Sequence, residues 1–321
     1  MMQRRLGGDG PTVGAIALGC MGMSEFYDSV PESEAIATIH RALDLGMNLI
    51  DTSDMYGRGE NERLVGRALR DRRDRAVLAT KGGLLRRDDD LAWRGVNGRP
   101  AYLKAACDAS LARLGVDHVD LYYLHRADPG VPIEESVGAM AELVTAGKVG
   151  RLGLSEVDAP ALRRAASVAP VAALQSEYSL FTRDVERNGV LETARAFGVT
   201  FVAYAPLGRG MLTRTMPSRD ELAMGDLRRR VPRFDEANVE HNLRLVDSLA
   251  SIAHERNMTP AQLALAWVVD RGDDIVALPG CQRVAQAEEN GAAGDLRLDA
   301  HARTSLDLLF APGAVAGERI R

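Results

Sequence analysis

Residues 33–51 read SEAIATIHRALDLGMNLID, and the fold can be predicted from the pattern of this stretch. Apolar side chains recur at helical spacing from Ser33 to Leu45, which predicts a helix. Gly46 follows directly, at the place where a helix commonly ends in a left-handed residue. The next apolar run, Asn48 to Asp51, has the length of a short buried strand. Helices that alternate with such strands are typical of βαβ units, so the stretch predicts a parallel sheet covered by helices.

The same alternation repeats along the whole chain. We predict eight strands, near residues 16–18, 48–51, 77–80, 120–124, 151–154, 172–175, 201–204 and 274–277. Helices are predicted near residues 33–45, 61–70, 102–114, 133–146, 159–169, 185–197, 239–256, 260–269 and 283–290. Gly115, Gly147 and Gly198 follow helix candidates as Gly46 does. Eight repeats without a break in composition favour the α/β class and a single (β/α)8 TIM barrel domain over residues 1–321.

A doubly wound sheet is the alternative fold, and it predicts a glycine-rich nucleotide fingerprint of the form GxGxxG. Two stretches begin this pattern, at Gly57 and at Gly208, but Glu62 and Thr213 stand where the third glycine is needed. The chain also contains no GxxxxGK[ST], HExxH or GxSxG stretch. These absences remove the main sequence support for phosphate-loop ATPases, zincin proteases and serine hydrolases.

Composition narrows the partners of the protein. The 40 Lys and Arg residues against 45 Asp and Glu give a net charge of −5, and the basic residues are scattered, so nucleic acid is a poor partner. The longest basic run, Arg228 to Arg230, is predicted to lie in a solvated loop. The three cysteines form no CxxC pair, which favours a reducing compartment. Because the start MMQRRLGGDG lacks a signal peptide's apolar region and no long apolar run occurs, we expect a cytoplasmic protein without a membrane partner.

Polar side chains stand at the carboxyl ends of three neighbouring predicted strands. Asp51, Lys81 and His125 end the second, third and fourth strands, and Tyr56 lies in the loop beyond Asp51. Each residue alone has a structural explanation: a turn cap, an ion pair, a core histidine or a loop aromatic. Because the loops at the carboxyl ends of barrel strands converge over the axis, the four together indicate an active site.

The four side chains have a common chemical logic. A phenol with an ordinary pKa of about 10 is a poor acid at neutral pH, but the ammonium of Lys81 would stabilise the Tyr56 anion and lower that pKa. Asp51 would keep Lys81 charged, and His125 would orient a carbonyl oxygen by a hydrogen bond. The reaction implied is proton donation to a carbonyl oxygen while its carbon receives a hydride. No metal ligand set is present, so the hydride is expected from an organic cofactor.

Residues 51–62 read DTSDMYGRGENE, which resembles the aldo-keto reductase signature D-T-A-x-x-Y-G-x-G-x-N-E, with Ser53 for the commoner Ala. Further segments that fit this family are residues 79–81, 113–117, 120–123, 153–155, 175–179, 203–210 and 259–265. The resemblance covers about Val13 to Leu298 and is strongest to the bacterial and plant branch that reduces small aldehydes and ketones with NADPH. It implies that Tyr56 is the general acid, that Lys81 and Asp51 tune it, and that His125 orients the carbonyl.

The resemblance also implies how NADPH or NADP+ is bound, extended across the C-terminal mouth of the barrel without a Rossmann fold. Ser155 and Gln175 match positions that hold the carboxamide, and Tyr204 matches the aromatic residue that stacks on the nicotinamide ring. The loop over the pyrophosphate is matched by Pro206, Leu207, Gly208 and Gly210. The clamp on the adenosine end is matched by Gly280, Arg283, Gln286, Glu289 and Asn290.

The chain departs from the family pattern at three places. The related branch usually reads P-G-T-K-R where this chain has Cys281 and Gln282 before Arg283, so a hydroxyl and a cation are missing beside the expected 2′-phosphate. The usual L-T-G-K becomes LTRT over residues 212–215, and Leu124 replaces a Gln that often precedes the histidine. We therefore expect a preference for NADPH over NADH that is weaker than a Lys-Arg pair at these positions would give.

Two rival functions remain open at this point. Some members of the family are non-catalytic regulatory subunits that carry the cofactor, and the fold by itself does not prove turnover. A metal-dependent barrel enzyme is a second rival, but His40, His118, His241, His254 and His301 fall on helix or linker patterns rather than at strand ends. The substrate, a small carbonyl compound, depends on loop residues: Met21, Phe26, Tyr27, Trp93 and the segment from Arg214 to Asn238. Nothing in the sequence specifies the oligomeric state.

Overall fold

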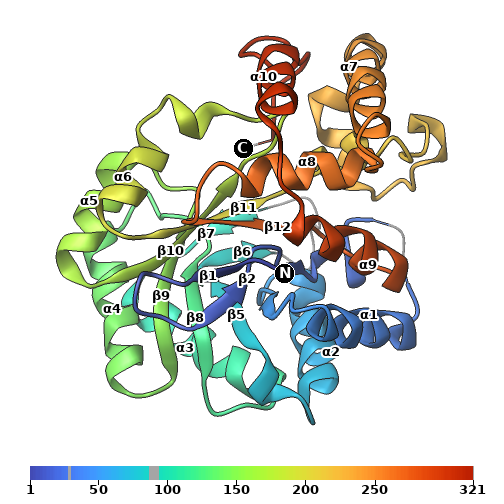
Figure 1. The fold of residues 1–321 in the computed structure, drawn as a ribbon. Helices are drawn as coiled ribbons and strands as arrows, with labels where there is room; N and C mark the ends of the chain where they lie inside the picture. Colours follow the sequence, from blue (N-terminus) through green and yellow to red (C-terminus); the bar gives the residue numbers. More distant parts are fainter. Residues whose placement is uncertain (28–29, 87–93, 321) are drawn as a thin grey trace.

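A sheet of eight parallel strands forms the centre of the computed structural model, which describes residues 1–27, 30–86 and 94–320. The strands are β3 (Leu18–Gly19), β4 (Leu49–Asp51), β5 (Val77–Gly82), β8 (Val119–Leu124), β9 (Val149–Ser155), β10 (Val171–Glu177), β11 (Thr200–Tyr204) and β12 (Ile275–Leu278). They lie in the order β12-β11-β10-β9-β8-β5-β4-β3. Bridges from Ile16 to Ala277 and from Gly19 to Gly280 join the two edges into a barrel (Figure 1). The eight predicted strands and the barrel are confirmed.

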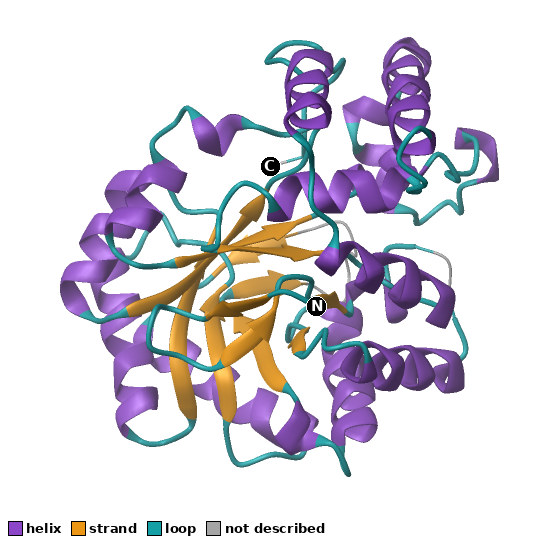
Figure 2. Ribbon diagram, in the orientation of Figure 1, coloured by secondary structure: helices purple, strands orange, loops and turns teal. Residues whose placement is uncertain are grey.

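The helices lie around the outside of the strands, as Figure 2 shows. They are α1 (Glu32–Asp44), α2 (Glu60–Leu69), α3 (Pro100–Leu114), α4 (Ile133–Thr145), α5 (Ala159–Val168), α6 (Val190–Ala196), α7 (Glu236–His254), α8 (Pro260–Val269), α9 (Val284–Ala292) and α10 (Ala300–Leu309). Gly46, Gly115, Gly147 and Gly198 have φ between 66° and 85°, so the left-handed helix ends predicted from the sequence are confirmed. Within the described ranges, no helix is both long and apolar enough to cross a membrane.

Several short elements were not predicted. Two antiparallel hairpins pair β1 (Gln3–Arg5) with β2 (Thr12–Gly14) and β6 (Leu84–Arg86) with β7 (Arg94–Val96). Short 3-10 segments cover residues 21–23, 56–59, 73–75, 184–186, 208–213, 219–221, 227–230, 232–234 and 293–295. Strands of three residues are too short to show a periodic pattern, and α10 follows a stretch without a strand signal.

The helix predicted over residues 185–197 is wrong in its first part. A short 3-10 segment, Asp184–Glu186, ends before Gly189, and α6 begins only at Val190. Gly189 has a φ of 79°, a left-handed conformation that a continuous right-handed helix does not contain. The prediction failed because the apolar spacing continues through Gly189, where the helical conformation is interrupted.

The solvated loop predicted for Arg228 to Arg230 is also wrong at its first residue. Arg228 is 8% exposed, and its Nε and Nη2 atoms donate to the Asp226 carboxylate at 2.9 and 2.6 Å. Its guanidinium also lies over the Tyr27 ring, 5.2 Å from the centroid. The segment after β11 is thus packed against the loop that follows β3.

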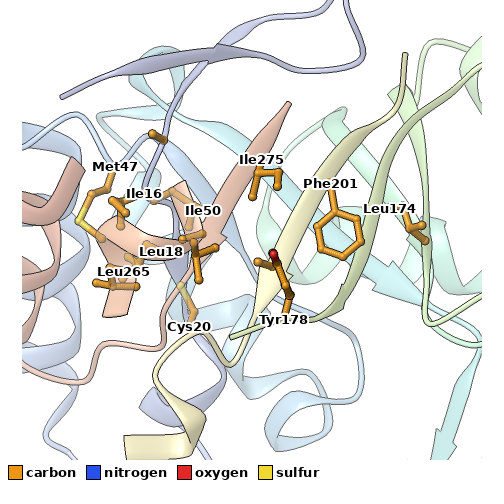
Figure 3. Close-up of a cluster of buried hydrophobic side chains, with 14 of the residues drawn as sticks. Ile16, Leu18, Cys20, Met47, Ile50, Leu174, Tyr178, Phe201, Leu265 and Ile275 are labelled. Atoms are coloured by element: carbon orange, nitrogen blue, oxygen red, sulfur yellow. The ribbon is translucent and has the colours of Figure 1, made fainter. Parts of the chain in front are cut away.

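The apolar core has two parts, one on each side of the barrel wall. The larger part fills the space between strands and helices; Figure 3 shows Ile16, Leu174, Phe201 and other members of it. The smaller part lies inside the barrel and consists of side chains such as Leu49, Ala79 and Val202. The hairpin of β1 and β2 contributes Leu6 and Val13 to this inner cluster. Apolar side chains thus fill the barrel interior, and polar side chains follow only at the strand ends.

Candidate active site

Strand alternation aims the predicted catalytic side chains at the inside of the barrel. Successive side chains of a strand point to opposite faces. On β4, Leu49 belongs to the inner cluster and Ile50 to the outer one, so Asp51 points inward. The same alternation on β5 and β8 directs Lys81 and His125 inward. Three predicted residues from separate strands therefore meet because of strand pleat alone.

Lys81 lies between Asp51 and Tyr56. Its Nζ donates to Asp51 Oδ1 at 2.5 Å, to the Thr52 carbonyl oxygen at 2.8 Å and to the Tyr56 hydroxyl at 3.3 Å. Lys81 is fully buried, whereas Tyr56 keeps 8% of its surface exposed. A buried ammonium is stable only when it is paired, and Asp51 supplies that pairing. The geometry can therefore bring a fixed positive charge to the Tyr56 hydroxyl.

The charge of Lys81 does not by itself make Tyr56 an acid of low pKa. Burial raises the pKa of Tyr56 above its ordinary value, although Lys81 acts in the opposite direction. For Lys81, burial alone would lower the pKa, but Asp51 and Tyr56 together more than offset it and raise the pKa, so the ammonium stays charged. The expectation of a net lowered phenol pKa is thus wrong, because burial outweighs the ammonium.

His125 stands edge-on to Tyr56, with ring centroids 6.0 Å apart. Burial, followed by the charges of Lys81 and Arg126, holds the pKa of His125 well below its ordinary value, so the imidazole is neutral. Its Nδ1 lies 3.1 Å from Ser53 Oγ. The neutral ring carries one N–H. This proton lies on Nε2 when the partner of Nδ1 donates a hydrogen bond, and on Nδ1 when that partner accepts one.

Asp54 extends this network by one residue. Ser53 Oγ donates to Asp54 Oδ1 at 3.1 Å, and the same oxygen lies 3.1 Å from His125 Nδ1. Burial, reinforced by the charge of Glu62, raises the pKa of Asp54 to about 7. The side chain next to the histidine's hydroxyl partner therefore changes charge near neutral pH.

The residues expected to hold the nicotinamide end three adjacent strands. Gln175 of β10 pairs in register with Ser155 of β9, and Tyr204 ends β11 beside them. Gln175 Nε2 donates to Asp51 Oδ2 at 2.8 Å, while Ser155 Oγ accepts from Arg126 at 3.0 Å. The amide of Gln175 therefore belongs to the network of the Asp51–Lys81 pair, whereas the hydroxyl of Ser155 is bonded to Arg126.

The loop after β11 bends sharply at its glycines. Pro206 and Leu207 lead into Gly208 and Gly210, which have φ of 57° and 94°. Arg209 between them also has a positive φ of 57°, and its Nη2 donates to the buried Glu177 at 3.2 Å. Left-handed backbone at three successive residues brings main-chain groups close to the mouth without a side chain at two of them.

The residues expected at the adenosine end lie on and before α9. Gly280 and the side chains of Arg283 and Gln286 are exposed, and a Cβ at Gly280 would have only a backbone oxygen at 3.9 Å near it. Glu289 is half-buried, and Asn290 is buried, with Nδ2 3.2 Å from Cys281 Sγ. Gln286 Oε1 accepts from the backbone N–H groups of residues 282 and 283 at 2.8 and 3.2 Å. These side chains are close in space, but Gln286 and Asn290 are already hydrogen-bonded to the loop itself.

Three residues near the site were not singled out by the sequence. Ser53 contacts His125, and the only signal was its departure from the usual Ala of the family signature. Arg126 bonds Ser155 and directly follows His125 in the chain. Glu34 of α1 accepts from the Val284 N–H of α9 at 3.2 Å. The two helices lie side by side (Figure 1). No sequence pattern links Glu34 to α9. Of the predicted substrate-loop residues, Trp93 lies outside the described residues.

Comparisons with known proteins extend over nearly the whole chain. Residues 15–309 match the sequence profile of the Aldo/keto reductase family. The NADP(+) aldo-keto reductase yakc of Schizosaccharomyces pombe is 44% identical over 299 residues, covering 92% of this chain and 87% of that protein. Among solved structures, glycerol dehydrogenase AKR11B4 from Gluconobacter oxydans is 31% identical with a TM-score of 0.88, covering 99% and 97% of the two chains. An aldo/keto reductase from Klebsiella pneumoniae in complex with NADP and acetate is 29% identical with a TM-score of 0.78, covering 100% and 99%.

Proposed function

The chain belongs to the aldo/keto reductase family, and from that premise we propose that it reduces aldehydes or ketones to alcohols with NADPH, using Tyr56 as the proton donor. It is an NADP-dependent oxidoreductase, as its yakc relative is named. We take residues 1–321 to work as one catalytic domain. The observation that carries the proposal is the contact of Lys81 Nζ with both Asp51 and the Tyr56 hydroxyl at the mouth of the barrel.

Tyr56 is the group that gives its proton to the carbonyl oxygen. It is the most exposed of the four residues, at 8%, so a substrate oxygen can reach its hydroxyl. As the proton leaves, the phenolate forms 3.3 Å from the Lys81 ammonium, which stabilises it. The raised pKa of the resting phenol keeps the proton in place until a carbonyl oxygen gains negative charge.

His125 orients the substrate by donating a hydrogen bond from Nε2. The ring is neutral, so one nitrogen donates and the other accepts. When the Ser53 hydroxyl donates to Nδ1 across 3.1 Å, the proton of the ring lies on Nε2. Because Ser53 has a single hydroxyl proton, this tautomer, which can polarise a carbonyl, requires Ser53 to donate to His125 rather than to Asp54 Oδ1.

The polar groups at the mouth fit a nicotinamide cofactor. Ser155 and Gln175 supply a hydroxyl and an amide in register on adjacent strands, which suits a carboxamide that both donates and accepts. Tyr204 offers an aromatic face on the next strand, and the open space at Gly280 leaves room for a close approach to the backbone. Arg283 is exposed beside that space and can bind a phosphate. When bound there, NADPH supplies the hydride.

The direct test is to mix the protein with NADPH and a panel of aliphatic and aromatic aldehydes and ketones and to follow the loss of NADPH absorbance. We expect aldehyde-dependent oxidation of NADPH and formation of one alcohol for each NADPH consumed. Binding of NADPH in a fluorescence titration without turnover of any carbonyl would contradict the proposal and favour a regulatory subunit.

A further inference from the structure

A polar cavity of about 630 Å³ opens beside the proposed catalytic residues, at the ends of β8 and β9. Its lining residues are Arg126, Glu156, Asp184, Arg187, Asn188 and Arg319. Arg126 follows His125 and Glu156 follows Ser155 in the chain, so the cavity adjoins the proposed orienting histidine and the expected nicotinamide site. All of the lining residues are polar, which is unlike a pocket built for an apolar substrate.

The two carboxylates of the cavity wall are paired with arginines. Glu156 accepts a two-pronged hydrogen bond from Arg319, at 3.0 and 2.9 Å, and another from the backbone N–H of Glu177 at 2.9 Å. Asp184 lies 3.7 Å from Arg187 Nη2 and 3.9 Å from Arg319 Nε. The negative charges of the wall are therefore balanced within it.

The C-terminal segment holds Arg319 against this wall. Asn242 of α7 exchanges two hydrogen bonds of 2.9 Å with the backbone of Ala316, and Arg233 donates to the Gly317 carbonyl oxygen at 3.3 Å. A Cβ at Gly317 would stand 2.8 Å from the backbone of residues 232 and 233, so the segment is packed closely there. These contacts hold the wall of the cavity in place, and Arg319 is paired with Glu156.

Arg126 is the cation of the wall for which no described carboxylate lies within ion-pair distance, although its charge helps to lower the pKa of the nearby Glu156. Its Nη1 donates to two uncharged oxygens, the His125 carbonyl at 2.7 Å and Ser155 Oγ at 3.0 Å. Among the described residues, its Nε and Nη2 have no hydrogen-bond partner, so three N–H donors of a half-buried guanidinium are left for a ligand. The three arginines of the wall exceed its two carboxylates by one charge.

We infer that this cavity is an anion subsite of the substrate site and that the preferred substrates are aldehydes or ketones that carry a carboxylate. The inference rests on the proposed function, because it assigns the substrate class of the same reaction. A guanidinium fork matches a carboxylate in shape and charge, and the hydrogen bond is strongest where water is partly excluded. With Nη1 held by His125 and Ser155, the free side of Arg126 is oriented before the substrate arrives.

The test compares two substrates with the same aldehyde and different charge, 4-oxobutanoate and its methyl ester. Because a hydrogen bond to a charged group strengthens binding more than one between neutral groups, we expect wild-type kcat/KM to favour the carboxylate by about 10- to 100-fold. The variant Arg126→Gln should lose this preference, measured as the ratio of kcat/KM for the two substrates, mainly through a higher KM for 4-oxobutanoate. Arg244→Gln, which removes an exposed arginine of α7 paired with Glu240, is the matched control and should keep the preference.

A binding measurement complements the kinetics. Succinate resembles 4-oxobutanoate but cannot be reduced, so its calorimetric titration into the protein reports the subsite without turnover. We expect binding by wild type and Arg244→Gln and at least a tenfold weaker binding by Arg126→Gln.

The outcomes separate this inference from the proposed function. Reduction of acid and ester at equal kcat/KM by wild type would overturn the anion subsite and leave the reductase standing. An Arg126→Gln variant that loses both substrates equally and also binds NADPH more weakly would likewise overturn it, since Arg126 would then serve the cofactor. Failure of wild type to oxidise NADPH with either substrate would overturn the proposed function and this inference with it.

Discussion

The mouth of the barrel has two ends that are built in opposite ways. At the end where we propose the proton donor, called the proton-donor end below, Asp51, Lys81 and His125 come from three strands, and none is more than 6% exposed. At the end where we expect the adenosine of the cofactor, called the adenosine end below, Arg283 and Gln286 are exposed, and their neighbours are mostly backbone groups of one loop. A buried charge is stable only with its partners in place, whereas an exposed one exchanges protein contacts for water at little cost. Substitutions should therefore have large effects at the proton-donor end and smaller, graded effects at the adenosine end.

The largest effect is expected from Lys81→Met. It leaves Asp51 buried without its cation and removes the charge that stabilises the Tyr56 anion, so we expect a loss in kcat/KM at least as large as that of Tyr56→Phe. Breaking a buried pair should also lower the free energy of unfolding by about 3–5 kcal/mol in a urea titration. The double variant Lys81→Met/Asp51→Asn should recover much of that stability but no activity.

Two outcomes would contradict this account of Lys81. A single variant as stable as wild type would show that the pair is not needed at this end of the mouth. An alkaline limb of the pH–rate profile that does not move in Lys81 variants would show that the ammonium does not tune Tyr56.

Tyr56→Phe should be nearly as damaging to turnover and harmless to the fold. The change removes the proton donor and little volume, and general acid catalysis contributes about 10²–10⁴-fold. NADPH affinity by fluorescence titration should stay within twofold of wild type, because the phenol belongs to the proton-donor end alone. Near-normal kcat in the Phe variant would refute the assignment of Tyr56 as the acid.

A pH effect on stability is expected from Asp54, beside the proton-donor end. Its pKa in the folded protein is raised from 3.8 to about 7, so the protonated form is favoured by folding. The stability it contributes is full below pH 3.8 and is lost as the pH rises through about 7. At about 1.4 kcal/mol for each pKa unit, the loss is of the order of 4 kcal/mol.

The measurement is the urea midpoint of wild type and Asp54→Asn between pH 4 and pH 8. The Asn variant should gain stability relative to wild type as the pH rises. Asp44→Asn is a control whose difference from wild type should stay nearly constant over this range, because a hydrogen bond from Arg75 lowers the pKa of Asp44 below its ordinary 3.8. If wild type and Asp54→Asn keep a constant difference across this range, Asp54 does not titrate there.

At the adenosine end, Arg283→Ala should weaken NADPH binding by about 10- to 150-fold, the value of a hydrogen bond to a charged group. NADH affinity should hardly change, because NADH has no 2′-phosphate. Equal NADPH and NADH affinities in wild type, or no loss for NADPH in the Ala variant, would place the phosphate elsewhere, with Arg209 and Arg214 as the next candidates.

The smallest effect is expected from Glu34→Gln, and it should be a gain. Glu34 occupies the first free N–H of α9 with a carboxylate, at the helix end where an anionic phosphate is expected. Removing this charge should strengthen NADPH binding about two- to fivefold at low salt, and 1 M salt should screen most of the gain. Glu288→Gln, which removes a carboxylate of α9 that is paired with Arg41 of α1, is the matched control. Unchanged NADPH affinity in Glu34→Gln would mean that the phosphate does not bind near Val284.

The sequence predicted elements better than it predicted their ends and exceptions. The strands and most helices follow from local periodicity, but the break at Gly189 lies inside an apolar pattern that continues on both sides. The burial of Arg228 was also missed, because its partners are Asp226 and a ring from the loop after β3. A run of charged residues predicts an exposed loop only when no carboxylate is placed to pair with it, and the fold decides that placement.

What the sequence alone determined is the barrel and the meeting of Asp51, Lys81 and His125, because strand pleat and parallel order place strand-end side chains at one mouth. Only the tertiary structure decided their finer setting: Ser53 against His125, Glu34 on α9, and Arg319 paired with Glu156 across 163 residues of chain. It also decided that burial outweighs Lys81 in setting the Tyr56 pKa. The physical reason is that periodicity is a local property, whereas burial and long-range pairing depend on the paths of loops that no periodicity describes.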